Sequence, residues 1–180
     1  MSVGSNLLYF TYEGSKPTTV TYNGTKYYYV TNLQGDVVAI LDGSGNPVVQ
    51  YVYDTWGKPL STTGTLADTL GQHNPLRYRG YIYDPETGLY YLQSRYYNPA
   101  IGRFLNADDI DYLGANDSLL SFNLFAYCQG NPINSTDPLG TVAISAFAGA
   151  VVGGAIAGAL ISTVSYTVTS GLSGESITKQ

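Results

Sequence analysis

The sequence predicts an all-β fold built from hairpins, followed by a short apolar helix near the C-terminus. Composition is the first observation: the 180 residues include 18 Tyr and 21 Gly, while charged residues make up only 12%. Tyrosine favours β-strands, and glycine favours turns and bulges. The second observation is a Tyr-rich strand motif that recurs along the chain, and the third is an uncharged stretch that begins after residue 141.

Two hairpins are predicted in the first third of the chain. Asn23-Gly24 separates two Thr- and Tyr-rich runs, residues 18–22 and 26–30. This dipeptide adopts the positive φ angles that a type I′ turn requires, so the two runs should pair as adjacent strands. A second pair of apolar runs lies within residues 36–53, around a loop of Asp, Gly, Ser, Asn and Pro. That arrangement predicts a second hairpin.

A strand motif repeats within the chain. Residues 51–54 are Tyr-Val-Tyr-Asp and residues 81–84 are Tyr-Ile-Tyr-Asp, each followed within a few positions by glycine. Residues 9–14 form a looser third copy. A repeated strand-turn unit cannot bury its apolar face alone, so it stacks on its neighbours into a solenoid or a continuous sheet. Three copies are few for such a fold, and the sequence therefore looks like the end of a longer repeat array.

Residues 51–58, Tyr-x-Tyr-Asp-x-x-Gly-Lys, resemble a YD repeat. Residues 79–105 closely resemble the RHS repeat-associated core, and the similarity continues through residues 123–140. The resemblance implies a YD-repeat sheet that spirals into a hollow cocoon, with an RHS-core plug at its C-terminal end. It divides the chain into a YD-repeat-like segment (1–76), the core (77–140), an apolar helical segment (141–162) and a short polar tail (163–180).

The resemblance assigns structural roles to many residues of the core: Arg79, Tyr81, Tyr83, Asp84, Gly88, Tyr90, Tyr91, Arg95, Tyr96, Tyr97, Gly102, Arg103, Phe104, Asn131, Pro132, Pro138 and Gly140. Residue chemistry supports some of these roles independently. Pro85 and Gly88 favour a turn after Asp84. The tyrosine rings are expected to pack as part of the shell, with their hydroxyls at a water-exposed boundary, rather than to stack on a carbohydrate. The three core arginines are expected to hold carboxylates or carbonyl oxygens.

The resemblance also implies a self-cleaving activity. Many RHS cores cut their own chain just after a D-P-x-G-L motif, using two aspartates as an aspartic-protease-like pair. Asp108 and Asp137 match these aspartates, and Thr141 is the residue expected just before the cut. One carboxyl of such a pair keeps its proton while the other activates water. Asp109 and Thr141 depart from the Pro and Leu of the family pattern, and the alternative role for residues 137–140 is a tight turn.

Residues 142–162 contain no charged side chain. A helix of this length spans about 30 Å, which matches a bilayer core, and its glycine spacing permits close helix contact. The alternative is an apolar helix packed on the plug or inside the shell. Residues 163–180 are too few to build a catalytic domain, so the effector that follows such cores is expected to be absent.

Charge and composition exclude several functions. The net charge is −5 and the eight basic residues are scattered, so no basic stripe could follow a nucleic-acid backbone. One His and one Cys, Cys128, provide neither a metal site nor a disulfide framework, and no cofactor is expected. Cys128 is expected to be a buried thiol. The N-terminus lacks the features of a signal peptide.

The sequence therefore predicts a closing segment of an RHS/YD-repeat shell of the polymorphic-toxin type, which encapsulates or presents an effector. Its expected partners are an upstream YD-repeat shell and a toxin cargo, outside the cell or at its surface. Two alternatives stay open. One is an aspartate-dependent self-cleaving core that releases the C-terminal tail, and the other is a membrane-anchored adhesion module that contacts the bilayer through residues 142–162.

Overall fold

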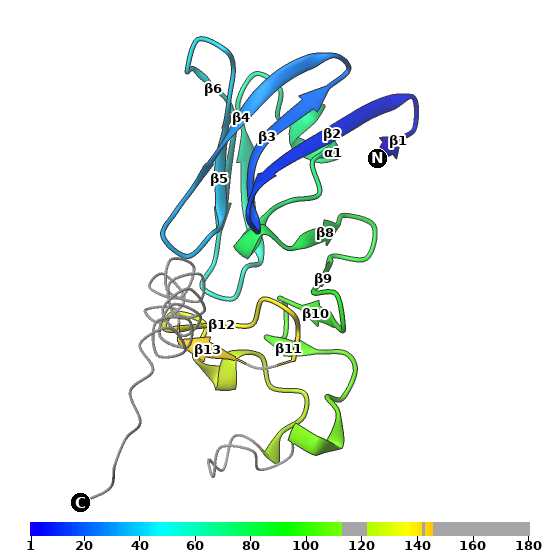
Figure 1. Cartoon of the computed structure of the whole chain (residues 1–180), viewed down its shortest axis with the longest axis vertical. Helices are drawn as coiled ribbons and strands as arrows, with labels where there is room; N and C mark the ends of the chain where they lie inside the picture. The colour runs from blue at the N-terminus through cyan, green and yellow to red at the C-terminus, as the bar shows by residue number, and fades with distance from the viewer. Residues whose placement is uncertain (113–121, 142, 146–180) are drawn as a thin grey trace, which may run out of the picture.

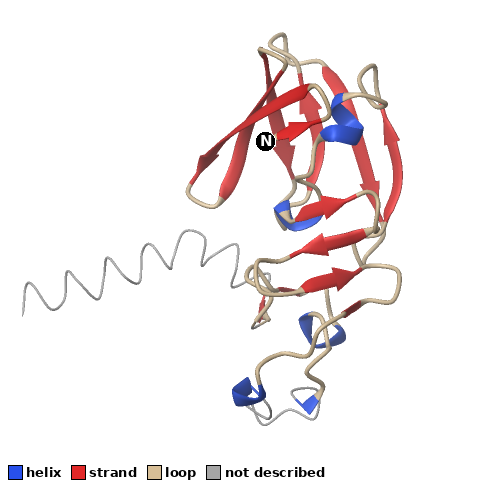
Figure 2. Cartoon of the chain, turned by 90° about the vertical axis from the view of Figure 1, so that its right-hand side faces the viewer, coloured by secondary structure: helices blue, strands red, loops and turns tan. Residues whose placement is uncertain are grey.

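The computed structural model describes residues 1–112, 122–141 and 143–145. These residues form an all-β structure, as the sequence predicts. It comprises a seven-stranded antiparallel sheet, a four-stranded sheet and a pair of short strands (Figure 1). The strands of the second sheet run across one end of the large sheet (Figure 2).

The large sheet comprises β1 (Ser2–Val3), β2 (Asn6–Glu13), β3 (Lys16–Tyr22), β4 (Thr25–Thr31), β5 (Val37–Leu41), β6 (Pro47–Tyr53) and β7 (Pro59–Thr63), hydrogen-bonded in that order. A short helix, α1 (Leu70–His73), and a 3-10 turn, η1 (Tyr78–Gly80), lead to the second sheet. That sheet comprises β8 (Ile82–Asp84), β9 (Leu89–Tyr91), β10 (Tyr96–Asn98) and β11 (Arg103–Phe104), again in chain order. The other elements are the 3-10 turns η2 (Ile110–Tyr112) and η4 (Cys128–Gly130) and the paired strands β12 (Ser135–Thr136) and β13 (Ile144–Ser145).

The two predicted hairpins are confirmed. Strands β3 and β4 pair across Asn23 and Gly24, whose φ angles are 49° and 85°, and β5 pairs with β6. A turn of the pattern Asx-x-x-Gly-x closes the three connections at residues 32–36, 42–46 and 54–58. In each turn the first side chain accepts the N–H of the fifth residue at 2.9 Å, and the glycine has a φ between 84° and 89°. Only glycine adopts this left-handed conformation without strain.

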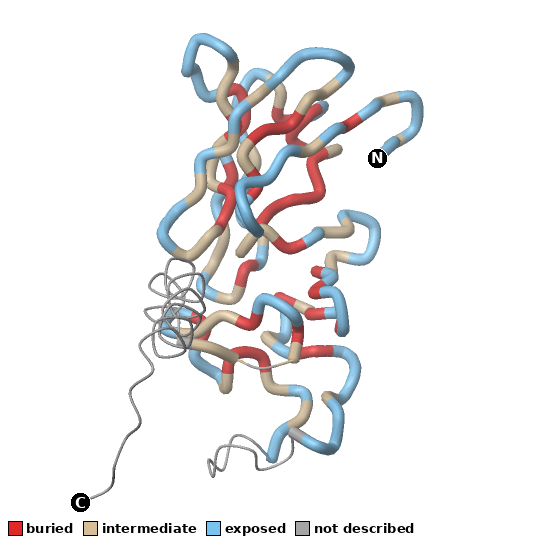
Figure 3. The backbone as a smooth tube through the Cα atoms, in the orientation of Figure 1, coloured by how far each residue is buried: buried red, intermediate tan, exposed pale blue. Residues whose placement is uncertain are grey.

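The buried residues, whose positions along the backbone are red in Figure 3, form two apolar cores. The core of the large sheet is aliphatic and includes Leu8, Val20, Ile40 and Val49, all fully buried. The second core is aromatic and comprises Tyr78, Tyr81, Tyr90, Leu92, Tyr97, Phe104, Tyr127 and Cys128. Its rings pack in tilted, edge-on and stacked pairs with centroids 4.1 to 6.3 Å apart. Such pairs contribute about 0.5–1.5 kcal/mol each beyond the area they bury, so this small core depends on its aromatic geometry.

The 54–58 turn is inserted into the aromatic core and connects the two sheets. Three buried tyrosines, Tyr78, Tyr97 and Tyr90, donate their hydroxyl protons to the carbonyl oxygens of Thr55, Trp56 and Gly57, at 3.1, 2.7 and 2.7 Å respectively. The expectation that the core tyrosines keep their hydroxyls at a wet boundary is therefore wrong for Tyr90 and Tyr97, whose side chains are fully buried. A buried hydroxyl needs a partner, and the turn carbonyls provide it. Tyr91 and Tyr96 are exposed, as expected.

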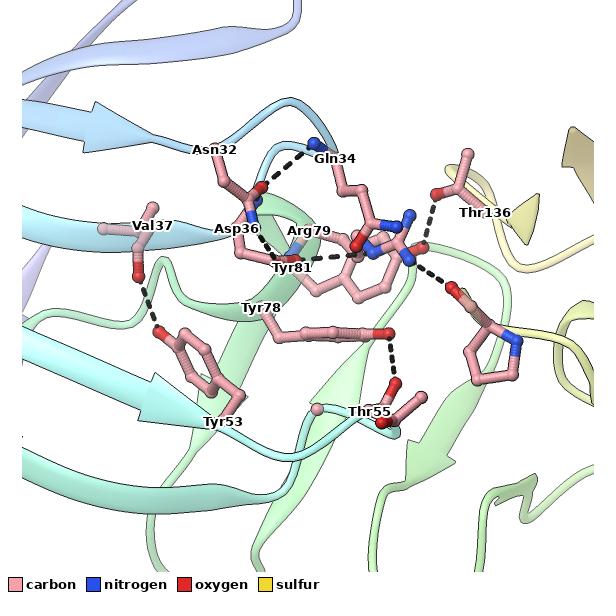
Figure 4. A network of polar contacts seen from close by, with 12 residues as sticks. Asn32, Gln34, Asp36, Val37, Tyr53, Thr55, Tyr78, Arg79, Tyr81 and Thr136 are labelled. Carbon is pink, nitrogen blue, oxygen red and sulfur yellow. Dashed lines mark hydrogen bonds and ion pairs between the residues drawn. The ribbon is translucent and has the colours of Figure 1, made fainter. Parts of the chain in front are cut away.

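A second connection runs through Arg79 (Figure 4). Its guanidinium is almost fully buried, lies 3.4 Å from the Asp36 carboxylate and donates a hydrogen bond to the Pro132 carbonyl oxygen. Its backbone N–H also binds Asp36, at 3.0 Å. Arg79 thus joins the large sheet to the segment that precedes β12, and the Tyr81 hydroxyl contacts β12 itself through Thr136 at 3.3 Å.

The predicted apolar helix lies mostly outside the described residues, because 142 and 146–162 are not among them. Ile144 and Ser145 are described, and they form strand β13 opposite β12. A helix beginning at residue 142 is therefore incorrect at these two positions, where pairing with Ser135 and Thr136 satisfies the backbone. No helix in the described residues has the length and apolar character that a bilayer crossing requires.

Candidate functional site

Arg95, in the turn between β9 and β10, contacts both of the predicted aspartates. It ends the tight turn 92–95 between β9 and β10, in which the Leu92 N–H donates to the Arg95 carbonyl oxygen at 2.9 Å. The Arg95 side chain is 5% exposed, and its guanidinium lies 3.6 Å from the centroid of the Phe104 ring. The ring and the turn therefore hold the charged group in one orientation.

The guanidinium contacts four residues from three segments of the chain. Nη2 lies 2.8 Å from Asp108 Oδ2 and 3.4 Å from Asp137 Oδ2. Nη1 donates to the Leu124 carbonyl oxygen at 2.9 Å, and Nε donates to the Gly140 carbonyl oxygen. A planar fork of N–H donors suits this kind of multiple contact. Asp108 and Asp137 thus meet at one guanidinium nitrogen, and Arg95 contacts both carboxylates.

Asp137 is the more buried of the two aspartates, with 2% exposure. It opens the sequence Asp-Pro-Leu-Gly-Thr, the same pattern as the turns of the large sheet. Its Oδ1 accepts the Thr141 N–H at 2.9 Å, and Gly140 has a φ of 71°. Burial raises the pKa of Asp137 above its ordinary value, although the Thr141 N–H and the Arg95 charge oppose this effect. Asp109 is exposed and points its N–H at Asp108 Oδ1, at 3.0 Å.

Ser94 is a site residue that sequence reasoning missed. Its Oγ donates to the Leu139 and Gly140 carbonyl oxygens, at 2.8 and 2.6 Å. Gly140 packs so closely here that an added Cβ would lie 2.8 Å from Ser94 Oγ. These contacts join residues that are 45 and 46 positions apart in the chain, so they leave no local pattern in the sequence. The only signal in the sequence was the position of Ser94 beside Arg95.

The other predicted core residues lie outside this cluster. Arg103 is exposed, contacts Asn123 Oδ1 at 3.3 Å and lies over the Phe125 ring. Gly102 packs against Trp56. The Asp84 carboxylate accepts the Thr87 hydroxyl at 2.7 Å in its own turn, which ends at Gly88 with a φ of 72°.

Several core residues support the cluster from outside. Tyr81 donates its hydroxyl proton to the Asp137 carbonyl oxygen at 2.9 Å. Tyr83 packs against Tyr90 with centroids 4.9 Å apart. Asn131 contacts Asn134 at 3.3 Å in the turn before β12, and Pro138 is exposed.

Comparisons with known proteins identify the family. A family model described as Teneurin YD-shell matches residues 5–133. The chain is 47% identical over 120 residues to the tRNA3(Ser)-specific nuclease WapA of Bacillus spizizenii, a match that covers 67% of this chain and 5% of that protein. It is 33% identical over 115 residues to the Double-stranded DNA deaminase toxin A of Burkholderia cenocepacia, covering 63% of this chain and 7% of that protein.

Among solved structures, the crystal structure of TcdB2-TccC3-Cdc42 matches with a TM-score of 0.64 at 26% identity, over 81% of this chain and 7% of that chain. The chain therefore spans only 5–7% of the length of these three proteins. Because the family model covers more than half of its residues, the chain belongs to the Teneurin YD-shell family of RHS/YD-repeat proteins.

Proposed function

We propose that this chain is the C-terminal closing segment of an RHS/YD-repeat shell that encapsulates or presents a toxin-type effector. The observation that carries the proposal is the free edge of β2. Within the described residues, β1 and the N-terminus pair only with Asn6, Leu7 and Leu8, so Tyr9 to Glu13 have no partner on that side. An unpaired edge readily accepts another strand. A preceding YD repeat would pair there and continue the sheet.

The opposite end of the molecule supports the closing role. Strands β8 to β11 have only two or three residues each and run across the end of the large sheet (Figure 2). Short strands turned across a sheet end limit further strand addition. The boundary between a YD-repeat-like segment and the core at residues 76 and 77 stays a prediction. The end of the core at residue 140 also stays a prediction, although β13, which pairs with β12, lies beyond it.

The names of the relatives also support a shell role for this segment. One relative is named a tRNA nuclease and another a double-stranded DNA deaminase toxin. Both share this segment over only 5% and 7% of their lengths. A segment common to proteins with different named chemistries is better suited to holding or presenting an effector than to acting as one. Secretion or cell-surface display belongs to the same proposal, since an effector shell has to leave the producing cell.

Protection of a cargo tests the proposal. The chain would be joined behind the YD repeats of a relative, with a trypsin-sensitive reporter attached after residue 180, and digestion of the reporter would be followed by electrophoresis. We expect the reporter to resist trypsin in the complete protein and to be digested when residues 77–145 are deleted. A deletion of residues 146–160 is the matched control and should preserve protection. Equal digestion of all three proteins would contradict the closing role.

Self-cleavage is a second candidate function, favoured by the meeting of Asp108 and Asp137 at Arg95. The raised pKa of Asp137 suits a group that keeps a proton. The carboxylate of Asp108, the second member of the pair, lies 2.8 Å from Arg95 Nη2. Intact-mass spectrometry of the purified chain tests this function. A single cut within residues 140–142 that is abolished by Asp137→Asn would support it, and an uncut, folded chain would refute it.

A further inference from the structure

A groove of about 330 Å³ lies beside β11, the edge strand of the second sheet. Four apolar side chains and one charged side chain line it, those of Ile101, Phe104, Leu105, Phe125 and Arg103. Backbone pairing joins the two segments that form its walls. The Phe104 N–H donates to the Phe125 carbonyl oxygen at 3.0 Å, and Arg103 forms a β-bridge with Ala126. The walls of the groove are therefore held by the fold itself.

The apolar side chains of the groove are exposed. Ile101 is 61% exposed, Leu105 47% and Phe125 37%. Arg103 is the one charged residue among those that line the groove, and its guanidinium lies 5.7 Å from the centroid of the Phe125 ring. Large apolar side chains that are exposed together in a concave place commonly mark a binding surface. This groove suits an apolar ligand without charge.

Residues 146–162 provide such a ligand within the same chain. Their sequence is Ala-Phe-Ala-Gly-Ala-Val-Val-Gly-Gly-Ala-Ile-Ala-Gly-Ala-Leu-Ile-Ser, in which Ser162 has the one polar side chain. Exposure of such a stretch to water is unfavourable. The segment follows directly on Ser145, the last residue that the structure describes, so it is tethered to the fold at that point.

The tether is long enough to reach the groove. It begins at the end of β13, which pairs with β12. A short series of contacts leads from β12 to the groove. The Tyr81 hydroxyl lies 3.3 Å from that of Thr136 and 3.3 Å from that of Tyr127. The centroids of the Tyr127 and Phe104 rings are 5.7 Å apart. Six or seven extended residues span about 20 Å, so the second half of the segment can occupy the groove.

We propose that residues 146–162 bind in this groove, with the large apolar side chains of their second half against its walls. These side chains are Ile156, Leu160 and Ile161. Tethering favours this occupant over a free partner, because a tethered ligand acts at an effective concentration in the millimolar range. The groove thus offers the apolar segment a protein surface, and not a bilayer, as its environment. This docking does not require an upstream shell.

Photo-cross-linking of the full 180-residue chain tests the docking. Leu105 is replaced by p-benzoylphenylalanine, and the irradiated protein is digested with endoproteinase Asp-N, which separates residues 84–107 from residues 137–180. We expect these two peptides to be linked within one chain, with the link assigned by fragment-ion sequencing to residues 146–162. Leu7 is the matched control, because it is 49% exposed and lies on β2, far from β11 (Figure 1). The same replacement at Leu7 should give no such link.

Other outcomes would overturn the proposal. A link from residue 105 to residues 113–121, a covalent dimer, or no link in a chain of intact mass would each exclude residues 146–162 as the occupant of the groove. Flotation of the unlinked chain with phosphatidylcholine vesicles would then identify a bilayer as the environment of the segment.

A charged side chain in the groove gives a second measurement. We expect Ile101→Asp to release the segment and to speed chymotrypsin cleavage within residues 146–162 about tenfold, because an aspartate loses most of the apolar contact that isoleucine makes. Leu7→Asp makes a similar change on an exposed strand outside the groove and should leave the cleavage rate unchanged. Near-ultraviolet circular dichroism confirms that both variants are folded. An unchanged rate in folded Ile101→Asp would overturn the docking.

Discussion

Replacement of Gly57 by alanine is expected to destabilise the protein far more than replacement of Gly45, although both glycines occupy the same place in the same turn pattern. Their φ angles are 86° and 84°, so an alanine at either position costs about 1 kcal/mol in backbone strain. The surroundings differ. A Cβ at residue 57 would lie 2.4 to 2.8 Å from three ring atoms of Tyr78, whereas a Cβ at residue 45 would meet nothing within 4 Å.

The Tyr78 ring cannot move away, because it is 2% exposed and its hydroxyl is bound to the Thr55 carbonyl oxygen. Overpacking of this kind costs about 2 kcal/mol. We therefore expect Gly57→Ala to lower the free energy of unfolding by about 3 kcal/mol and Gly45→Ala by about 1 kcal/mol.

Urea denaturation followed by the fluorescence of Trp56, the only tryptophan, measures both effects. With an m-value of about 2 kcal/mol per molar urea, the midpoint should fall by about 1.5 M for Gly57→Ala and by about 0.5 M for Gly45→Ala. Equal shifts for the two variants would refute the packing argument, because backbone strain alone would then account for both.

Three further predictions concern single side chains. Tyr97→Phe should cost about 1–2 kcal/mol in chemical denaturation, because the Trp56 carbonyl oxygen loses its donor in a buried place, whereas Tyr96→Phe on the exposed face should change stability by less than about 0.5 kcal/mol. The raised pKa of Asp137 means that the folded state binds its proton more tightly than the unfolded state. The contribution of Asp137 to the free energy of unfolding is therefore complete below the unfolded pKa of about 3.9 and is lost as the pH rises through the folded pKa. Urea titrations at a series of pH values should show this dependence in the wild type and not in Asp137→Asn. Burial raises the pKa of Cys128 to about 12. A thiol reagent at pH 8 should therefore label Cys128 quickly in the unfolded chain, and in the native chain only at the rate at which the structure around it opens. Rapid labelling of the native chain would contradict this burial.

The parts of the fold that follow from local chemistry were predictable. Asn23-Gly24 specified its hairpin because two consecutive positive φ angles admit few other residues. The repeated Tyr-x-Tyr-Asp motif indicated stacked strand-turn units, and residues 51–53 do form the C-terminal end of β6. Short strands such as β11 and β12 were not predicted, because two residues carry no readable alternation.

The candidate site was predictable only in part, for a similar reason. The family resemblance identified Asp108, Asp137 and Arg95, but the place of Arg95 between the two carboxylates depends on tertiary structure. The role of Ser94 depends on a contact with residues far along the chain, and serine occurs in so many turns that its presence alone indicates nothing. The same limit explains the burial of the Tyr90 and Tyr97 hydroxyls, which the strand pattern placed at a wet boundary.

The insertion of the 54–58 turn into the aromatic core has a consequence for how repeats of different sequence can be joined. Three tyrosine hydroxyls recognise the carbonyl oxygens of residues 55, 56 and 57, and every amino acid carries that oxygen. Through these three hydrogen bonds the aromatic core therefore recognises the backbone shape of the turn, which the Asp54 side chain closes by binding the Lys58 N–H. Phenylalanine would fill the same space without this recognition, which gives a physical reason for 18 Tyr against 5 Phe in the chain. A closing segment built this way can follow any repeat that ends in a turn of this shape, so its compatibility is set by backbone geometry and can survive extensive change in the sequence of the preceding repeats.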